Sequence, residues 1–441
     1  MQTGFSAEQL ADPKMASSEA VVRKCVHCGF CTATCPTYVL LGDELDSPRG
    51  RIHLMKTMLE TEAVPSAEVV KHIDRCLSCL ACMTTCPSGV NYMHLVDHAR
   101  SYIEERYRRP VMEQWTRWML AAILPYPRRL RAALGLARVA RPLAPLLARV
   151  AGLGPLAAML RMAPRTIPAR PTEVTRLLPG AKGRVALLQG CAEPVLRPEY
   201  RAATIRLLER IGYEVVLAPG ETCCGALTHH LGRGADAETA ARRNIDAWTR
   251  EAKQKGLAAI IVTASGCGTH IKDYGFILRA DSTYSESAAR VSALARDISE
   301  FLLEAGLPPG KGHGLTVAYH SACSLQHGQK VVDAPRRLLA GAGFAVRTPI
   351  EAHLCCGSAG TYNILQPEIA AALGERKAAN LERLGADLIV TGNVGCAVQI
   401  AGHSMLPIVH LIELLDWATG GPRPAALEPL NHGEDHARAD A

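Results

Sequence analysis

Eight cysteines between residues 25 and 86 form two runs with the same spacing. The runs are Cys25–Pro36 (CVHCGFCTATCP) and Cys76–Pro87 (CLSCLACMTTCP). Three thiolates spaced two residues apart fit on one tight loop around a [4Fe–4S] cluster, and the proline after the fourth cysteine turns the chain away. Zinc knuckles and disulfide frameworks space their cysteines differently. The two runs therefore predict two [4Fe–4S] clusters and a protein that conducts electrons.

The two runs also predict how the cysteines are shared between the clusters. In bacterial two-cluster ferredoxins, the fourth cysteine of each run binds the cluster of the other run. The predicted ligand sets are Cys25, Cys28, Cys31 and Cys86 for the first cluster, and Cys76, Cys79, Cys82 and Cys35 for the second.

The residues around the two runs have helical patterns. Ser47 followed by Pro48 is typical of a helix start, and apolar residues then recur at helical spacing as far as Leu59. A second helix is expected over residues 92–107. The first domain is therefore predicted to be an α-helical ferredoxin domain. Arg49 and Arg51 could offset the negative charge of a cluster, but we expect them to be a surface pair at the helix start.

The other eight cysteines form two matching sets later in the chain. The sets are Cys191, Cys223, Cys224 and Cys267, and Cys323, Cys355, Cys356 and Cys396. In each set an apolar strand precedes the first and the last cysteine, and a Cys-Cys-Gly turn lies between them. Strands that alternate with helical stretches predict two repeated α/β domains with parallel sheets.

Cysteines at the carboxyl ends of parallel strands face the crevice where such sheets bind ligands. We therefore predict a metal site in each repeat, with an iron–sulfur cluster favoured and zinc as the other metal that four thiolates could hold. The alternatives are that one or both sets are buried structural thiols, or that one repeat has lost its metal.

The segment from residue 106 to 180 is strongly basic. It contains fourteen arginines, no lysine and two acids, so its net charge is near +12 in a chain of net charge +7. Such a segment could face anionic lipid or an acidic partner, or it could be a solvated helical connector; we expect no nucleic-acid partner. It has no stretch of about 20 apolar residues that could span a bilayer, and prolines at 125, 127, 142 and 145 divide it into short helices.

Composition and the N-terminal sequence bear on the compartment and the domains. The first twenty residues contain no apolar stretch of a secretory signal, so we expect a reducing cytoplasm, where the basic segment could lie on the inner face of the membrane or pack on the ferredoxin domain. The predicted domains are the ferredoxin domain (1–105), the helical connector (106–180), the first and second Cys-Cys-Gly domains (181–310 and 311–420) and a disordered polar tail (421–441).

The combination of these motifs resembles a known family. Two Cys-Cys-Gly repeats behind a helical two-cluster ferredoxin domain resemble the family of heterodisulfide reductase subunits, lactate-utilisation proteins and the third subunit of anaerobic glycerol-3-phosphate dehydrogenase. Four sequence segments resemble the glycolate oxidase iron–sulfur subunits more specifically. They are CVHCGFCTATCPTYVLLGDELDSPRGR (25–51), TASGCG (263–268), LQHGQ (325–329) and HLCCGSAGTY (353–362). The resemblance covers nearly the whole chain, except the basic segment and the tail after residue 420.

This resemblance implies an electron-transfer subunit of a glycolate oxidase, or glycolate dehydrogenase, complex. Flavin-containing partner subunits would oxidise glycolate to glyoxylate, and this chain would pass their electrons to a quinone or another respiratory acceptor. The chain has no convincing flavin or nicotinamide fingerprint, because Gly232-Arg-Gly234 follows no strand and lacks the third glycine. We therefore expect no flavin, no NAD and no catalytic residue for the organic substrate in this chain. The alternatives are the equivalent subunit for lactate, another 2-hydroxy acid or glycerol-3-phosphate, or a metal-stabilised scaffold that does not conduct.

The sequence departs from the family at the last ligand position of each repeat. Members with five-cysteine sites end each repeat in C-x2-C, whereas this chain has His270 and Gln399 at those positions. His270 is a candidate substitute ligand in the first repeat, although we favour a polar loop residue. We expect four nearby histidines to orient loops, namely His229, His230, His320 and His327.

Overall fold

The computed structural model describes residues 1–150, 152–164, 166–170, 175 and 177–428. The N-terminal helices are α1 (Ala7–Leu10), α2 (Pro13–Lys24), α3 (Pro36–Leu41), η1 (Glu44–Asp46), α4 (Pro48–Glu60), α5 (Ala67–Asp74), α6 (Ala81–Thr85) and α7 (Tyr92–Arg106). The next helices are α8 (Val111–Ile123), α9 (Pro127–Ala140), η2 (Arg141–Leu143), α10 (Ala144–Leu147) and α11 (Gly154–Met162).

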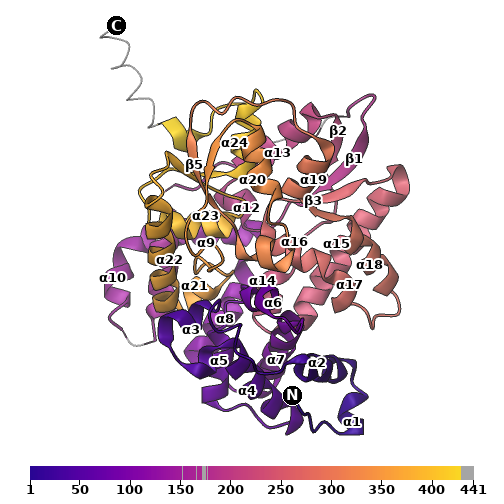
Figure 1. The fold of residues 1–441 in the computed structure, drawn as a ribbon, viewed down its shortest axis with the longest axis vertical. Coiled ribbons are helices and arrows are strands. Elements are labelled where there is room, and N and C mark those ends of the chain that lie inside the picture. The colour runs from indigo at the N-terminus through magenta and orange to yellow at the C-terminus, as the bar shows by residue number, and fades with distance from the viewer. Residues whose placement is uncertain (151, 165, 171–174, 176, 429–441) are drawn as a thin grey trace.

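Two repeats of strands and helices follow. The first contains β1 (Gly183–Leu187), α12 (Glu193–Leu196), α13 (Glu199–Arg210), β2 (Tyr213–Val216), α14 (Ala226–His230), α15 (Gly234–Lys255), β3 (Ala259–Val262), α16 (Ser265–Lys272), α17 (Tyr274–Ile277), α18 (Ser285–Leu294), β4 (Ala295–Asp297) and α19 (Ile298–Ala305). The second contains β5 (Thr316–His320), η3 (Ser324–Gly328), α20 (Ala334–Gly341), β6 (Ala345–Arg347), α21 (Tyr362–Leu365), α22 (Pro367–Glu382), β7 (Leu388–Thr391), α23 (Val394–Ala401), β8 (Ile408–His410) and α24 (Leu411–Ala418). The N-terminal helices lie at one end of the molecule and the two repeats at the other (Figure 1).

The N-terminal region is helical, as predicted. The hydroxyl of Ser47 accepts a hydrogen bond from the N–H of Gly50 at 3.0 Å, and Pro48 occupies the first turn of α4. The apolar face of α4 packs with α2, α5 and α7 in a core that includes Ile52, Met55 and Leu59. This core supports the loops that carry the first eight cysteines.

The two repeats contain parallel sheets with the same strand order, so the predicted fold class is confirmed. The orders are β2-β1-β3-β4 and β6-β5-β7-β8, and every paired strand is parallel. The central strands β3 and β7 are continuous buried apolar runs, as expected when helices cover both faces of a sheet. The chain moves to opposite sides of β1 and β5, which creates a crevice at the carboxyl ends of the strands in each sheet.

The two repeats share one hydrophobic core. Helix α13 packs on α24, and α19 packs on α20. The ring of His410 stacks on Tyr200 with 4.3 Å between centroids, and its Nε2 lies 3.2 Å from the carbonyl oxygen of Thr263. The guanidinium of Arg206 donates to the buried carboxylate of Asp416 at 2.6 Å. The positions of the two crevices are therefore fixed relative to each other.

The basic segment forms short helices that pack on both ends of the molecule. Arg109 and Arg117 donate to the carboxylate of Asp74 in α5 at 2.6 and 2.8 Å, and α9 contacts α12 of the first repeat. Across the part of the chain with assigned positions, no helix has the length and apolar character needed to cross a bilayer. The domain boundaries stay predictions, and residues 429–441 of the predicted tail lie outside the described residues.

Candidate iron–sulfur sites

The two N-terminal cysteine runs have the same backbone shape. Residues two and four positions after the first cysteine have left-handed φ angles in both runs: His27 (55°) and Gly29 (84°) in the first, and Ser78 (49°) and Leu80 (64°) in the second. The two loops therefore turn in the same way. Cys25, Cys28, Cys31 and Cys86, the predicted first set, all line one small cavity, together with Cys82 of the second run.

The second set is more deeply buried. Burial raises the pKa values of the Cys79 and Cys82 thiols, and the neighbouring thiols Cys76 and Cys35 raise them further. Cys35 belongs to the first run, so residues from both runs lie close to one another here. From α7, the Arg100 guanidinium donates to the carbonyl oxygen of Cys76 at 2.6 Å and holds this loop in place.

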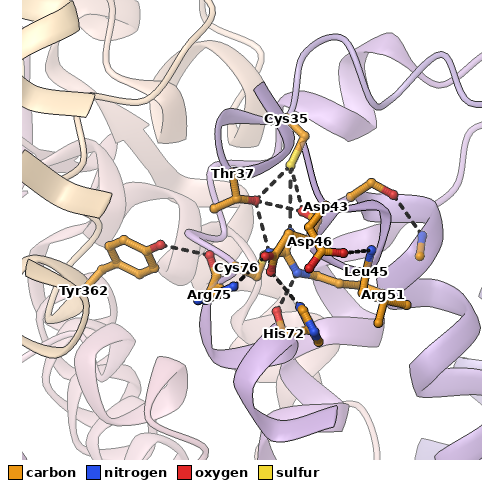
Figure 2. A network of polar contacts seen from close by, with 12 residues as sticks. Cys35, Thr37, Asp43, Leu45, Asp46, Arg51, His72, Arg75, Cys76 and Tyr362 are labelled. Atoms are coloured by element: carbon orange, nitrogen blue, oxygen red, sulfur yellow. Dashed lines mark hydrogen bonds and ion pairs between the residues drawn. The ribbon is translucent and has the colours of Figure 1, made fainter. Parts of the chain in front are cut away.

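A buried ionic network lies directly behind Cys35 (Figure 2). Arg51 is only 1% exposed, and its Nη1 lies 3.8 Å from the Cys35 sulfur. The same guanidinium donates to Asp46 at 3.2 Å and to the carbonyl oxygen of His72 at 2.6 Å. Arg75 donates to the other carboxylate oxygen of Asp46 at 2.8 Å. The expectation that Arg51 lies on the surface is therefore wrong: it is a buried cation beside a predicted cluster ligand.

In the first repeat, the four predicted cysteines converge at the carboxyl ends of the strands. The sulfurs of Cys191 and Cys223 are 3.5 Å apart. Cys224 shares hydrogen bonds with Cys223 and Cys267, and these bonds and burial raise its pKa. Gly225 has φ +93°, and a Cβ there would lie 3.0 Å from the carbonyl oxygen of Ala237. Glycine is thus required at this turn, because the backbone is left-handed and tightly packed.

In the second repeat, the corresponding cysteines also converge. The sulfurs of Cys323 and Cys355 are 3.7 Å apart, and Cys356 shares hydrogen bonds with Cys355 and Cys396 that lower its pKa. The ligand atoms of His320, Cys356 and Cys396 all lie within 4.8 Å of one another. This site therefore offers four thiols and one imidazole.

His320 was expected only to orient a loop, but it lies at the end of β5 against two thiols. Its Nδ1 pairs with the hydroxyl of Thr391 at 3.0 Å, which fixes the ring. A sequence signal existed, because His320 ends the same strand that leads to Cys323. That signal was weak, since only the packing of β5 against β7 brings His320 to Cys396.

His270 and Gln399 stand where family members with five-cysteine sites have the last cysteine of each repeat, and their surroundings differ. His270 is buried, and its Nε2 has no hydrogen-bond partner among the described residues. Its ring lies 5.0 Å from that of His229, and its Nε2 faces the turn at Gly225. Gln399 instead donates to the carbonyl oxygen of Ala370 at 3.0 Å. Gln399 is thus part of the protein scaffold, while the ligand role of His270 stays a prediction.

The donor sets fit iron–sulfur clusters. All sixteen cysteines are free thiols. Several of these thiols have raised pKa values. The pKa of Cys31, for example, rises to about 11, mainly through burial. Soft thiolate donors in buried pockets are the ligands that iron–sulfur clusters use. The assignment of individual cysteines to individual clusters stays a prediction.

The second N-terminal set lies against the second repeat. Cys79, Cys355 and Tyr362 belong to one apolar core, against which Cys323 also packs. The hydroxyl of Tyr362 donates to the carbonyl oxygen of Arg75 at 3.0 Å (Figure 2). The thiols of Cys79 and Cys323 are close enough for Cys323 to raise the pKa of Cys79.

Comparisons with known proteins agree with this architecture. The family described as a 4Fe-4S dicluster domain matches residues 21–90, and the family described as a cysteine-rich domain matches residues 185–272 and 317–401. The glycolate oxidase iron–sulfur subunit of Escherichia coli K12 is 41% identical over 95% of this chain and 99% of its own length. A protein named probable glycolate oxidase iron–sulfur subunit, from Bacillus subtilis 168, is 32% identical over 92% of this chain and 96% of its own length.

More distant relatives share part of the chain or only the fold. Lactate utilization protein A of Bacillus licheniformis is 27% identical and matches 53% of this chain and 99% of its own length. The crystal structure of a hypothetical protein from Helicobacter pylori superimposes with a TM-score of 0.55 at 11% identity, over 94% of this chain and 74% of that one. This structure shows similarity of fold alone.

Proposed function

The chain belongs to the family of glycolate oxidase iron–sulfur subunits, and from this premise we propose that it is the electron-transfer subunit of a complex that oxidises glycolate to glyoxylate. Partner subunits that contain flavin oxidise the substrate, and a quinone or another respiratory acceptor receives the electrons. The two relatives that match nearly their full length support this proposal by their names. The chain itself does not act on glycolate.

The residues of this chain hold the redox centres and insulate them. Cys25, Cys28, Cys31 and Cys86 form one ligand set, and Cys76, Cys79, Cys82 and Cys35 form the other. The two repeat sets each hold a further cluster or a zinc ion. Iron–sulfur clusters supply one-electron chemistry when bound, which suits a donor such as flavin that can release two electrons singly.

The observation that carries the proposal is the shared core of Cys79 and the second repeat. Electron transfer needs short separations between centres, and this core joins the second N-terminal set to Cys323 and Cys355. The first set lies next to the exposed side chains of Val26 and Phe30. We propose that the partner subunits dock on that side and that the second repeat is the next centre inward.

Peripheral membrane contact is part of the same proposal. Helices α8 and α9 expose large apolar side chains, namely Val111, Met112, Trp115, Leu136 and Val139. Arginines lie among them, and an apolar face flanked by arginine suits the surface of an anionic bilayer. Flotation of the complex with vesicles containing phosphatidylglycerol tests this contact.

The experiment is anaerobic purification of the tagged chain with its partners, followed by iron and sulfide analysis and EPR. We expect flavin in the copurified subunits, EPR signals that glycolate reduces, and about eight irons per chain if only the N-terminal sets are filled or about sixteen if all four are. If lactate or glycerol-3-phosphate reduces the EPR-active centres and glycolate does not, the proposal that glycolate is the substrate is wrong. Lactate is the main competitor, because the lactate utilization relatives share half of the chain. If no substrate or physiological donor reduces any centre, the conducting role is wrong.

A further inference from the structure

A large cavity lies between the basic helices and the first repeat. Its volume is about 840 Å³, within the range of small-molecule sites. One wall is formed by α8 and α9, and the opposite wall by Gln189, Gly190, Thr222 and Cys223. These residues follow β1 and β2, so the cavity opens at the carboxyl ends of the strands, where parallel sheets bind ligands. The electron-transfer role described above does not use this cavity.

The cavity is strongly positive. Seven arginines and two acids line it. One acid, Asp236, is paired with Arg233 at 2.8 Å. The other, Glu221, accepts hydrogen bonds from the N–H of Gln189 and, at 3.0 Å, from Nε1 of Trp248. Among the residues whose positions are described, the remaining six arginines form no ion pair.

Several of these guanidinium groups are held in place by neutral acceptors. Arg201 donates to the carbonyl oxygen of Gln189 at 2.8 Å, and Arg131 donates to the carbonyl oxygen of Pro194 at 3.4 Å. These bonds orient the guanidinium groups without neutralising them. Arg128 and Arg243 are exposed, and no described side chain bonds to either. Arginine is the side chain best suited to bind carboxylate or phosphate through two parallel hydrogen bonds.

The same cavity has an apolar wall. Trp118, Tyr126 and three prolines line it. The guanidinium of Arg129 lies 4.2 Å from the centre of the Tyr126 ring, so this wall already accepts a flat group by stacking. Aromatic and proline side chains favour a planar ring, and the arginines favour negative groups attached to it.

We propose that this cavity binds a planar organic anion that carries phosphate or carboxylate groups, beside the thiols of the first repeat. The anionic groups pair with Arg128 and Arg243, and the ring packs against Trp118 and Tyr126. This is a ligand site in addition to the electron-transfer role, and it does not depend on the substrate of the complex.

The test is calorimetric titration of the full metal-loaded chain with ADP, adenosine and pyrophosphate. ADP has both the ring and the charge, adenosine only the ring, and pyrophosphate only the charge. We expect ADP to bind at least tenfold more tightly than adenosine, and pyrophosphate to compete with it. Arg243→Ala and Arg128→Ala should each weaken ADP binding about tenfold, as expected for loss of a charge-assisted bond.

The matched control is Arg138→Ala, which removes an exposed arginine from α9 outside the cavity. We expect ADP binding within twofold of the unmodified chain. Equal losses in Arg138→Ala and Arg243→Ala would assign the effect to net charge and overturn the proposal. So would equal affinities for ADP and adenosine, or no binding of ADP and pyrophosphate. Binding of phosphatidylglycerol vesicles that depends on Arg243, without binding of ADP, would assign the arginines to a lipid headgroup and also overturn it.

Discussion

Replacing Arg51 tests whether a buried protein charge sets the potential of a redox centre in this chain. Arg51 is the buried cation behind Cys35, and the thiols of Cys76 and Cys35 together with Asp46 hold its pKa above its usual value despite burial. It is therefore charged at any pH at which the protein is folded. Arg51→Met keeps the length and the apolar stem of the side chain and removes the charge.

The structure gives the size of the effect. The Nη1 atom of Arg51 lies 3.8 Å from the Cys35 sulfur. At an effective dielectric constant of about 20, a positive unit charge at that distance attracts a negative unit charge on the sulfur with an energy of about 4 kcal/mol. That energy corresponds to about 170 mV for one electron, since about 1.4 kcal/mol is equivalent to about 59 mV. The added electron is spread over a whole cluster and not placed on one sulfur, so we expect roughly half of this shift. Removing the cation destabilises the reduced form, and the midpoint potential of that cluster should fall by about 100 mV.

The assay is an EPR-monitored redox titration of the purified chain. Lys56→Met is the matched control, because it removes a cation from the same helix that pairs with Glu60 near the surface; its potentials should stay within about 20 mV of the unmodified chain. Arg51→Lys should recover part of the shift, since it restores the charge but not the planar fork. A fall of less than about 20 mV in Arg51→Met, with full cluster content, would refute the reasoning. Loss of the cluster would show that Arg51 is needed for assembly, and Arg51→Lys would then be the variant to titrate.

Three further changes test other parts of the structure. Cys79→Ser should lower iron content by about four per chain; unchanged iron would remove Cys79 from the ligand set. Asp74→Asn leaves two buried arginines without a full partner and should lower the free energy of unfolding by about 3 kcal/mol in urea denaturation; a loss below about 1 kcal/mol would contradict this role. Arg376 and Asn380 hold the pKa of Glu351 at about 2, below its ordinary 4.5. Its stabilising effect should be present above pH 4.5 and lost as the pH falls toward 2, so Glu351→Gln should flatten acid unfolding over that range, as followed by circular dichroism.

The sequence predicted most of what depends on local spacing. The capped start of α4 at Ser47 and the strands that precede Cys191 and Cys323 are short-range patterns, and they lie as expected. One detail differs: Cys267 and Cys396 lie in the first turns of α16 and α23 and not at the ends of their strands. A helix that starts directly after a buried strand leaves little local signal of where the strand stops.

The residues that the sequence placed wrongly are those whose surroundings come from distant parts of the chain. Arg49 and Arg51 are two residues apart at one helix start, yet Arg49 pairs with Glu44 near solvent while Arg51 is buried against His72. Nothing local distinguishes them. The side that faces the core is decided by α5, which lies more than fifteen residues further along. His320 is a similar case, because its contact with Cys396 depends on the pairing of β5 with β7.

The two repeats have the same sheet and the same cysteine pattern, but their neighbours differ. The second repeat packs against the N-terminal helices through Tyr362 and Cys323. The first repeat faces a cavity lined by arginines through Cys223. Because each site offers four thiols, what each site contacts helps to separate the roles of the two sites. A site packed against another cysteine set suits electron relay, and a site beside a charged cavity suits the binding of a diffusible anion that we propose. Duplication of one fold therefore allows one chain to hold both kinds of site, with the basic helices supplying the difference.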